Sequence, residues 1–122
     1  MGLNNSFDQI VTNASMTATV NSLGMPCQQL VLASIQAEWT GAPVGTLHLE
    51  ISNDEVPYAP GNQANAGANV VNWSVYTGST TAVSGPGNFL WNCVFVGYSW
   101  MRLVYTPTSG TGTINAYFTG KG

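Results

Sequence analysis

Charge is the scarcest feature of this sequence. Its 122 residues include two Lys or Arg, five Asp or Glu and one His, so charged side chains make up 6% of the chain, against roughly 25% in a typical soluble domain. Because positive charge is limited to Arg102 and Lys121, no phosphate-binding patch can form, and we expect no nucleic-acid partner. A neutral surface rich in Asn, Ser and Thr repels its neighbours weakly, which favours permanent packing against other subunits. A neutral surface without functional meaning is the alternative.

Other signals are also missing. No basic amphipathic stretch and no long apolar run occurs, so we expect no membrane anchor. The start, Met1 to Asn5, lacks a charged region followed by an apolar one, so we expect no signal peptide and synthesis in a host cytoplasm. The two cysteines, Cys27 and Cys93, are too few for a disulfide framework. We therefore expect buried, reduced thiols, with a single disulfide as the alternative.

What is present is a hydrophobic fraction of 44%, enough for a core, with alternating apolar residues and no helical period. We expect an N-terminal arm over 1–24, with a short strand at Met16–Val20, and a β-sandwich domain over 25–122. Two further segments are expected to be strands: Thr80–Ser84, and Phe89–Val96 with apolar residues on both faces, as in a central or interface strand.

Period-2 alternation assigns the core faces of the remaining strands. Residues 28–40 and 46–52 are expected to form one β-hairpin, and residues 100–105 and 114–118 a second hairpin joined by Thr106–Gly112. The side chains expected to face the core are Val31, Ala33, Ile35, Ala37, Trp39, Leu47, Leu49, Ile51, Val71, Trp73, Val75, Met101, Leu103, Tyr105, Ile114, Ala116 and Phe118. Asn53–Asn69 lacks periodicity and is expected to be a loop. Seven or eight strands with turns between them predict an all-β, two-sheet sandwich of jelly-roll or related Greek-key type.

Candidate catalytic and metal-binding groups are few. His48 and Glu50 lie on the same polar strand face, and a solvated face with one chance ion pair explains them better than an acid–base or metal pair. A zinc site would need Cys27, Cys93 and His48 to converge, although His48 points away from the apolar side. Asn53–Glu55 matches no calcium motif and fits a turn. We expect no catalytic residue, no metal and no cofactor.

Aromatic side chains are the better candidates for binding. Tyr and Trp can stack on sugar rings or anchor a subunit, and together with Arg they are enriched at protein interfaces. Trp73 is assigned to the core by its alternation. The candidate interface residues are Tyr58, Tyr76, Trp100 and Arg102.

Three sequence segments resemble small β-sandwich virion proteins of tailed bacteriophages. They are Gly45-Thr-Leu-His-Leu-Glu-Ile-Ser-Asn-Asp54, Asn72-Trp73, and the strand Tyr98 to Tyr105 with its Arg102-Leu-Val-Tyr105 end, which leads into Ser109-Gly-Thr-Gly-Thr113. The resemblance covers roughly residues 28–119. Val56–Asn69 departs from it, because a short link is expected at that point.

The resemblance implies a virion structural protein, such as a capsid decoration or cement protein or a minor tail protein, and no enzymatic activity. The leading hypothesis is a homo-oligomer that binds the major capsid protein or other virion subunits and reinforces the shell. The alternative is a carbohydrate- or receptor-binding module of a phage tail, with a glycan as its ligand. Fold alone does not separate the two, since one sandwich architecture hosts many functions.

Overall fold

The computed structural model describes residues 5–28, 30–54, 69–94 and 98–122. Its strands are β1 (Asn5–Ser15), β2 (Val20–Asn21), β3 (Met25–Pro26), β4 (Leu32–Gly41), β5 (Val44–Ser52), β6 (Ser74–Val75), β7 (Thr81–Ser84), β8 (Gly87–Val94), β9 (Trp100–Ser109) and β10 (Gly112–Lys121). No helix in these ranges is long and apolar enough to cross a membrane.

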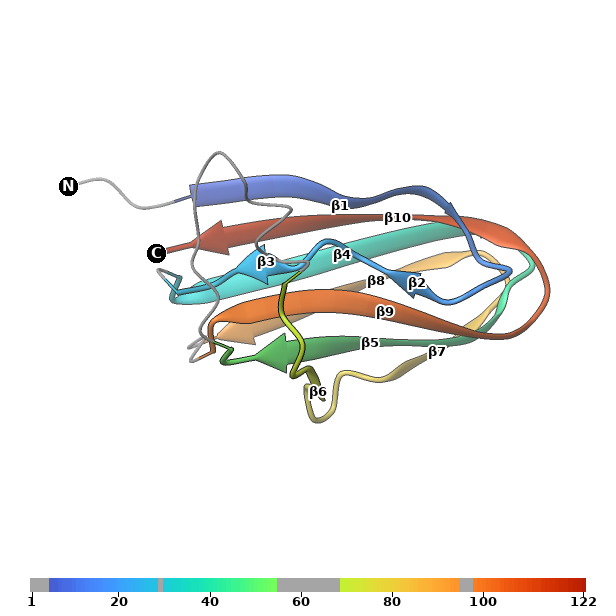
Figure 1. The fold of residues 1–122 in the computed structure, drawn as a ribbon. Helices are drawn as coiled ribbons and strands as arrows, with labels where there is room; N and C mark the ends of the chain where they lie inside the picture. Colours follow the sequence, from blue (N-terminus) through green and yellow to red (C-terminus); the bar gives the residue numbers. More distant parts are fainter. Residues whose placement is uncertain (1–4, 29, 55–68, 95–97) are drawn as a thin grey trace.

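The strands form two antiparallel sheets that pack face to face (Figure 1). The four-stranded sheet has the order β1-β10-β4-β8, and the six-stranded sheet has the order β2-β9-β5-β6, with β3 also on β9 and β7 also on β5. β2 and β3 together occupy one end of the six-stranded sheet, beside β9, and β6 and β7 together occupy its other end, beside β5. The two sheets then have four strand positions each, and these follow the order of a jelly roll. The predicted all-β, two-sheet sandwich is confirmed.

The two predicted hairpins are wrong, although their strands exist. β4 pairs with β10 and β8, whereas β5 pairs with β9, β6 and β7, so consecutive strands lie in opposite sheets. The same holds for β9 and β10. Alternation along a strand tells which face is buried, but not which strand lies beside it. A short turn can therefore join two sheets as readily as it joins two neighbours.

Glycine makes these sheet-to-sheet turns tight. Gly41 and Gly110 have φ of 90° and 81°, in the left-handed region that other residues rarely adopt. The turns lie against each other, with the Ala42 amide donating to the carbonyl oxygen of Thr111 at 2.8 Å. A Cβ on Gly110 would collide with the carbonyl oxygen of Ala42. The predicted long connection Thr106–Gly112 is therefore two residues, with β9 and β10 extending to either side of it.

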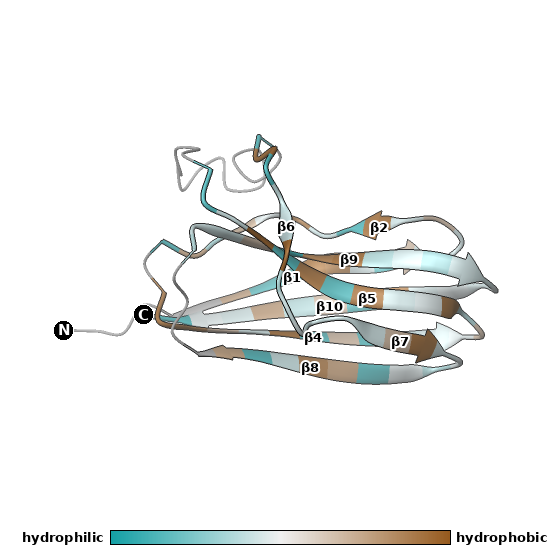
Figure 2. Cartoon of the chain, turned by 90° about the horizontal axis from the view of Figure 1, so that it is seen from below, coloured by the Kyte–Doolittle hydropathy of each residue, from teal (hydrophilic) through white to brown (hydrophobic). Residues whose placement is uncertain are grey.

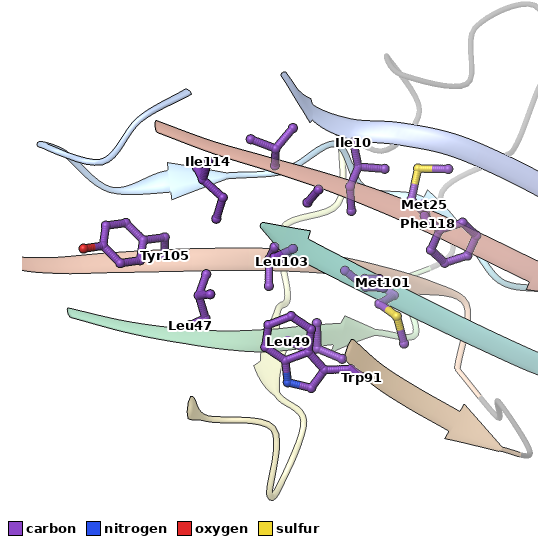
Figure 3. Close-up of a cluster of buried hydrophobic side chains, with 14 of the residues drawn as sticks. Ile10, Met25, Leu47, Leu49, Trp91, Met101, Leu103, Tyr105, Ile114 and Phe118 are labelled. Atoms are coloured by element: carbon purple, nitrogen blue, oxygen red, sulfur yellow. The ribbon is translucent and has the colours of Figure 1, made fainter. Parts of the chain in front are cut away.

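The core lies between the inner faces of the two sheets (Figure 3). The six-stranded sheet contributes Leu47 and Leu49 from β5, which lie opposite Tyr105 and Leu103 of β9. Most of the predicted core residues are confirmed as buried: Ala33, Ile35, Ala37, Trp39, Leu47, Leu49, Met101, Leu103, Tyr105, Ile114, Ala116 and Phe118, with Ile51 partly buried against them. Figure 2 shows the alternation of apolar and polar residues along β5.

The prediction for residues 71–75 is wrong. Val71 and Val75 are 77% and 52% exposed, and Trp73 packs on the outside of the six-stranded sheet against Val70 and Trp100. Only Ser74–Val75 is a strand, paired with Ile51 and Glu50 of β5. Val31, also assigned to the core, is 50% exposed because it precedes β4.

The N-terminal residues form an integral strand where an irregular arm was expected. β1 pairs with β10 over almost its whole length, with two register shifts between Gln9 and Ala14. These bulges place the neighbours Ile10 and Val11 both in the core, so period-2 alternation is lost. The expected strand Met16–Val20 is wrong, since Met16 is a buried turn residue and β2 begins at Val20.

β7 confirms the strand expected at Thr80–Ser84, whereas of the two roles expected for β8 the central one is wrong and the interface one stays a prediction. β8 ends the four-stranded sheet, so it is not a central strand, and its apolar residues on both faces include the exposed Phe89 and Leu90. The part of the predicted strand after Val94 and most of the loop Asn53–Asn69 lie outside the described residues.

We expect Leu49→Ala to lower the free energy of unfolding by about 2–5 kcal/mol, because it removes a fully buried side chain between the sheets. Val71→Ala is the matched control and is expected to change it by less than about 0.5 kcal/mol. Urea unfolding followed by tryptophan fluorescence measures both. Equal losses in the two variants would contradict this description of the core.

Candidate functional site

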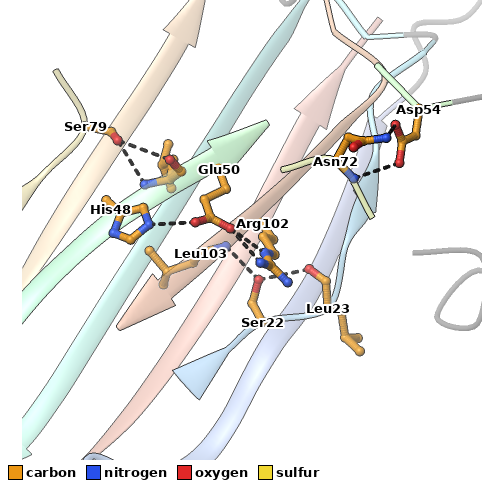
Figure 4. A network of polar contacts seen from close by, with 10 residues as sticks. Ser22, Leu23, His48, Glu50, Asp54, Asn72, Ser79, Arg102 and Leu103 are labelled. Carbon is orange, nitrogen blue, oxygen red and sulfur yellow. Dashed lines mark hydrogen bonds and ion pairs between the residues drawn. The ribbon is translucent and has the colours of Figure 1, made fainter. Parts of the chain in front are cut away.

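Ionic side chains gather on the outer face of the six-stranded sheet (Figure 4). Alternation along β5 points His48 and Glu50 to this face, and the β5–β9 register places Arg102 opposite Glu50. We call His48, Glu50 and Arg102 the Glu50 cluster. It holds the single histidine of the chain and one of its two Lys or Arg residues.

Both carboxylate oxygens of Glu50 are engaged. Oε2 lies 3.0 Å from Nε2 of His48, and Oε1 accepts from Nε of Arg102 at 2.8 Å and forms an ion pair with its Nη2 at 2.6 Å. The guanidinium Cζ lies 4.5 Å from the ring centroid of Trp73, a cation–π contact. The three side chains of the cluster are 15–23% exposed. The ion pair expected between His48 and Glu50 is present, and it belongs to a larger network.

The pKa of Glu50 reflects two opposed effects. Partial burial raises it, but hydrogen bonds from His48 and Arg102, together with their positive charges, outweigh burial and lower the pKa below its ordinary value of 4.5. Glu50 therefore stays ionised near neutral pH and holds Arg102 in place. A carboxylate with both oxygens occupied is a poor general base, so the arrangement suits structure better than proton transfer.

A second polar group joins the end of β5 to the segment that begins at Val71. Asp54 accepts hydrogen bonds from the amides of Val71 and Asn72 at 2.8 and 2.9 Å, and from the Asn72 side chain at 2.8 Å. These bonds lower the pKa of Asp54. Asn53 accepts from the amide of Ser99 at 3.0 Å. Asn53 and Asp54 therefore join segments that are distant in sequence, and the local turn expected for them is not seen, while Glu55 lies outside the described residues.

The two cysteines lie in the interior. Cys27 and Cys93 are 1% and 3% exposed, and each is a free thiol. Burial and the neighbouring Cys93 raise the pKa of Cys27 to about 12, which makes the reactive thiolate scarce. His48 lies on the outer face of the six-stranded sheet, away from the interior, so the three residues do not converge as a zinc site would require. Among the residues described, no group of three or more His, Cys, Asp or Glu could hold a metal ion.

Of the four candidate interface residues, the structure describes Tyr76, Trp100 and Arg102, and it contradicts the expectation for Trp100. Trp100 is fully buried, because Val70 and Trp73 cover the outer face of β9 at that end, so its prediction as an exposed anchor is wrong. Tyr76 is half-buried against the core and lies 5.9 Å from Tyr98, ring centroid to centroid. Arg102 is held in the Glu50 cluster. Tyr58 lies outside the described residues.

An exposed apolar surface that was not predicted from the sequence lies on the outer face of the four-stranded sheet. Phe7 is 70% exposed and stacks on Tyr117, with ring centroids 6.3 Å apart and planes 6° from parallel. A shallow hollow there is lined by Phe7, Ser34, Gln36, Leu90, Tyr117 and Thr119, which we call the neutral face. Tyr117 occupies an outward position between the buried Ala116 and Phe118, a signal that the alternation did contain.

Comparisons with known proteins find a similar fold but no matching family. No family model matches the chain, and no curated protein matches its sequence. A solved structure, the SPBc2 prophage-derived protein YomS, is similar with a TM-score of 0.53 at 8% sequence identity. The similarity spans 98% of this chain and 96% of that one. The chain therefore shares its overall all-β, two-sheet fold with a prophage-derived protein.

We expect Glu50 to contribute to stability only where it is ionised. Since its pKa is lowered on folding, this contribution is present above the unfolded pKa near 4.5 and is lost as pH falls through the folded pKa. Glu50→Gln should therefore destabilise the protein at pH 7 by on the order of 1 kcal/mol, and the difference should shrink below pH 4.5.

Thermal unfolding measured from pH 7 into the acid range tests this. Glu38→Gln is the control, because Glu38 is an exposed carboxylate on the other sheet. A wild-type advantage over Glu50→Gln that grows as pH falls would contradict the assigned network.

Proposed function

We propose that this protein is a structural subunit of a bacteriophage particle, a capsid decoration or cement protein that acts by binding and not by catalysis. The observation that carries the proposal is the similarity over the whole chain to a prophage-derived protein. The sequence resemblance to small virion proteins points to the same class of protein. Under this proposal the partners are the major capsid protein, or other virion subunits, and further copies of this chain.

The distribution of charge supports an assembling protein. The Glu50 cluster uses its charges internally, and the neutral face offers amide, hydroxyl and apolar groups without a charge. Neutral surfaces of this kind suit subunit contacts that form once and persist, since no charge has to be desolvated. Docking on a capsid lattice would then proceed through many short hydrogen bonds.

The test uses particles of the phage that encodes the chain and particles from a strain in which its gene is deleted. We expect mass spectrometry to find the protein in the first preparation, and the second to release its DNA at lower temperature. Purified protein added back should bind the deleted particles and restore their stability. Absence from purified particles would overturn the proposal.

Attachment should weaken little with salt, because few charges take part. Between about 0.1 and 1 M salt the Debye length falls from about 10 to 3 Å, and we expect the bound fraction to change less than about twofold over this range. Co-sedimentation of protein and particles measures it. Release in moderate salt would indicate attachment through charges.

A carbohydrate-binding module of a phage tail is the second candidate, and the neutral face favours it. Binding sites for small polar ligands combine aromatic surface with a few placed polar groups, and here Phe7 and Tyr117 lie beside Ser34, Gln36 and Thr119. Glycan-array binding that is lost in Phe7→Ala and Tyr117→Ala, but kept in Val71→Ala, would move this candidate to first place. Location of the protein at the tail would support the same change.

A further inference from the structure

The edge of β8 that faces away from β4 has the features of an interaction surface. β8 pairs with β4 from Trp39 opposite Gly87 to Leu32 opposite Val94, without a register shift. Within the described ranges, no strand pairs with its other side. An end strand presents a row of unpaired backbone N–H and C=O groups, which invites another strand to pair with it.

The other sheet ends are protected in ways that β8 is not. β1, at the opposite end of the same sheet, contains two register shifts, and its Asn13 has a positive φ of 46°. Asn115 fixes that irregular backbone by accepting from the Asn13 amide at 2.8 Å. In the six-stranded sheet, β2, β3 and β6 have two residues each and β7 has four. Bulges and short strands are established protections against edge pairing.

β8 has eight residues, Gly-Asn-Phe-Leu-Trp-Asn-Cys-Val, with no charge and no proline. Leu90 and Phe89 near its centre are 50% and 40% exposed. A regular, uncharged and apolar edge of this length is the type that aggregates unless a partner covers it. The edge therefore has the chemistry of an interface.

We infer that the free edge of β8 pairs antiparallel with the same edge of a second copy of this chain, about a two-fold axis at Leu90. Symmetry supports this occupant. Residues directly opposite each other in antiparallel strands point to the same side of the sheet. A two-fold axis perpendicular to the sheet must therefore place one residue opposite its own copy, and it cannot lie midway between two successive residues. Leu90 lies at the middle of the strand on the outer face, and the axis buries this exposed leucine against its own copy.

The neighbouring pairs in this register are complementary. Asn88 lies opposite Asn92 of the second copy, and a side-chain amide can both donate and accept. On the inner side, Phe89 lies opposite Trp91 of the second copy, extending the edge-to-face contact that the two rings make within one chain at 4.8 Å. No like charges meet. Two four-stranded sheets would become one continuous sheet, with both neutral faces on the same side.

This inference rests on the proposed assembly role, to which it gives a contact surface. A cross-linking experiment tests the register directly. With the axis at Leu90, Leu90→Cys places two thiols opposite each other at a separation that a disulfide can span. We expect a covalent dimer under mild oxidation. Gln36→Cys is the matched control: Gln36 is exposed on the same outer face and lies beside Leu90 on β4, one strand from the edge.

A charge variant tests the affinity. Leu90→Lys brings two ammonium groups together at the axis and is expected to raise the dimer dissociation constant by about tenfold or more. Gln36→Lys should leave it unchanged. Sedimentation velocity across micromolar concentrations measures both. Because both substitutions are on an exposed face, unchanged urea midpoints confirm that the variants are folded.

The outcomes separate the inference from the proposed function. A monomeric wild type, or a dimer that Leu90→Lys leaves intact and Leu90→Cys does not cross-link, overturns pairing through β8 even if the protein is found in phage particles. A dimer that responds as expected while the protein is absent from particles retains the interface and overturns the virion role.

Discussion

The contact between the two inner sheet faces is the interaction on which the rest of this structure depends. Leu47, Leu49 and Leu103 on one sheet and Ile35 and Phe118 on the other are almost completely buried. Each such side chain contributes about 1.5–3 kcal/mol by leaving water. Both described thiols are free, and the ionic contacts lie on the outside, so burial of apolar surface is the main force that holds the sheets together.

The scarcity of charge affects both the polar contacts and the sheet edges of this molecule. The single arginine and the single histidine both contact one carboxylate, that of Glu50, and Asp54 is hydrogen-bonded to Val71 and Asn72. The other positive side chain, Lys121, is at the end of β10. Few charges are left to guard sheet edges, and the protein relies instead on bulges and short strands. β8 has neither, so the same compositional feature that gives a neutral surface also leaves one edge open.

The sequence predicted well which face of each strand is buried, and predicted poorly which strands lie side by side. Strict alternation placed Leu47, Leu49, Met101 and Leu103 inward, because an error of one residue would have exposed the whole set. The same alternation is indifferent to strand partners, so strands that cross between sheets were assigned to hairpins. Irregular backbone was invisible for a related reason: the β1 bulges bury the adjacent Ile10 and Val11, which no period-2 pattern predicts.

One of the candidate interface residues, Trp100, was misjudged for a different reason. Residue type gives the capacity of a side chain for contact, but exposure depends on what packs over it. Trp100 occupies an outward strand position and is nonetheless buried, because Val70 and Trp73 fold over it. Tyr117 and Leu90 also occupy outward positions and stay accessible, because they lie on a face that no described segment covers. Long-range covering by a loop leaves no local signal in the covered strand.

A jelly roll with one open edge is suited to assembly in a definite direction. Closed edges prevent growth in several directions at once, whereas a single regular edge that pairs about a two-fold axis closes on itself after two copies. The pair would still present two neutral faces side by side, which doubles the surface available to a lattice or a polymer. Weak contacts on each face would then act together, with the second forming at a high effective concentration. A small and nearly uncharged domain can in this way bind firmly without any single strong site.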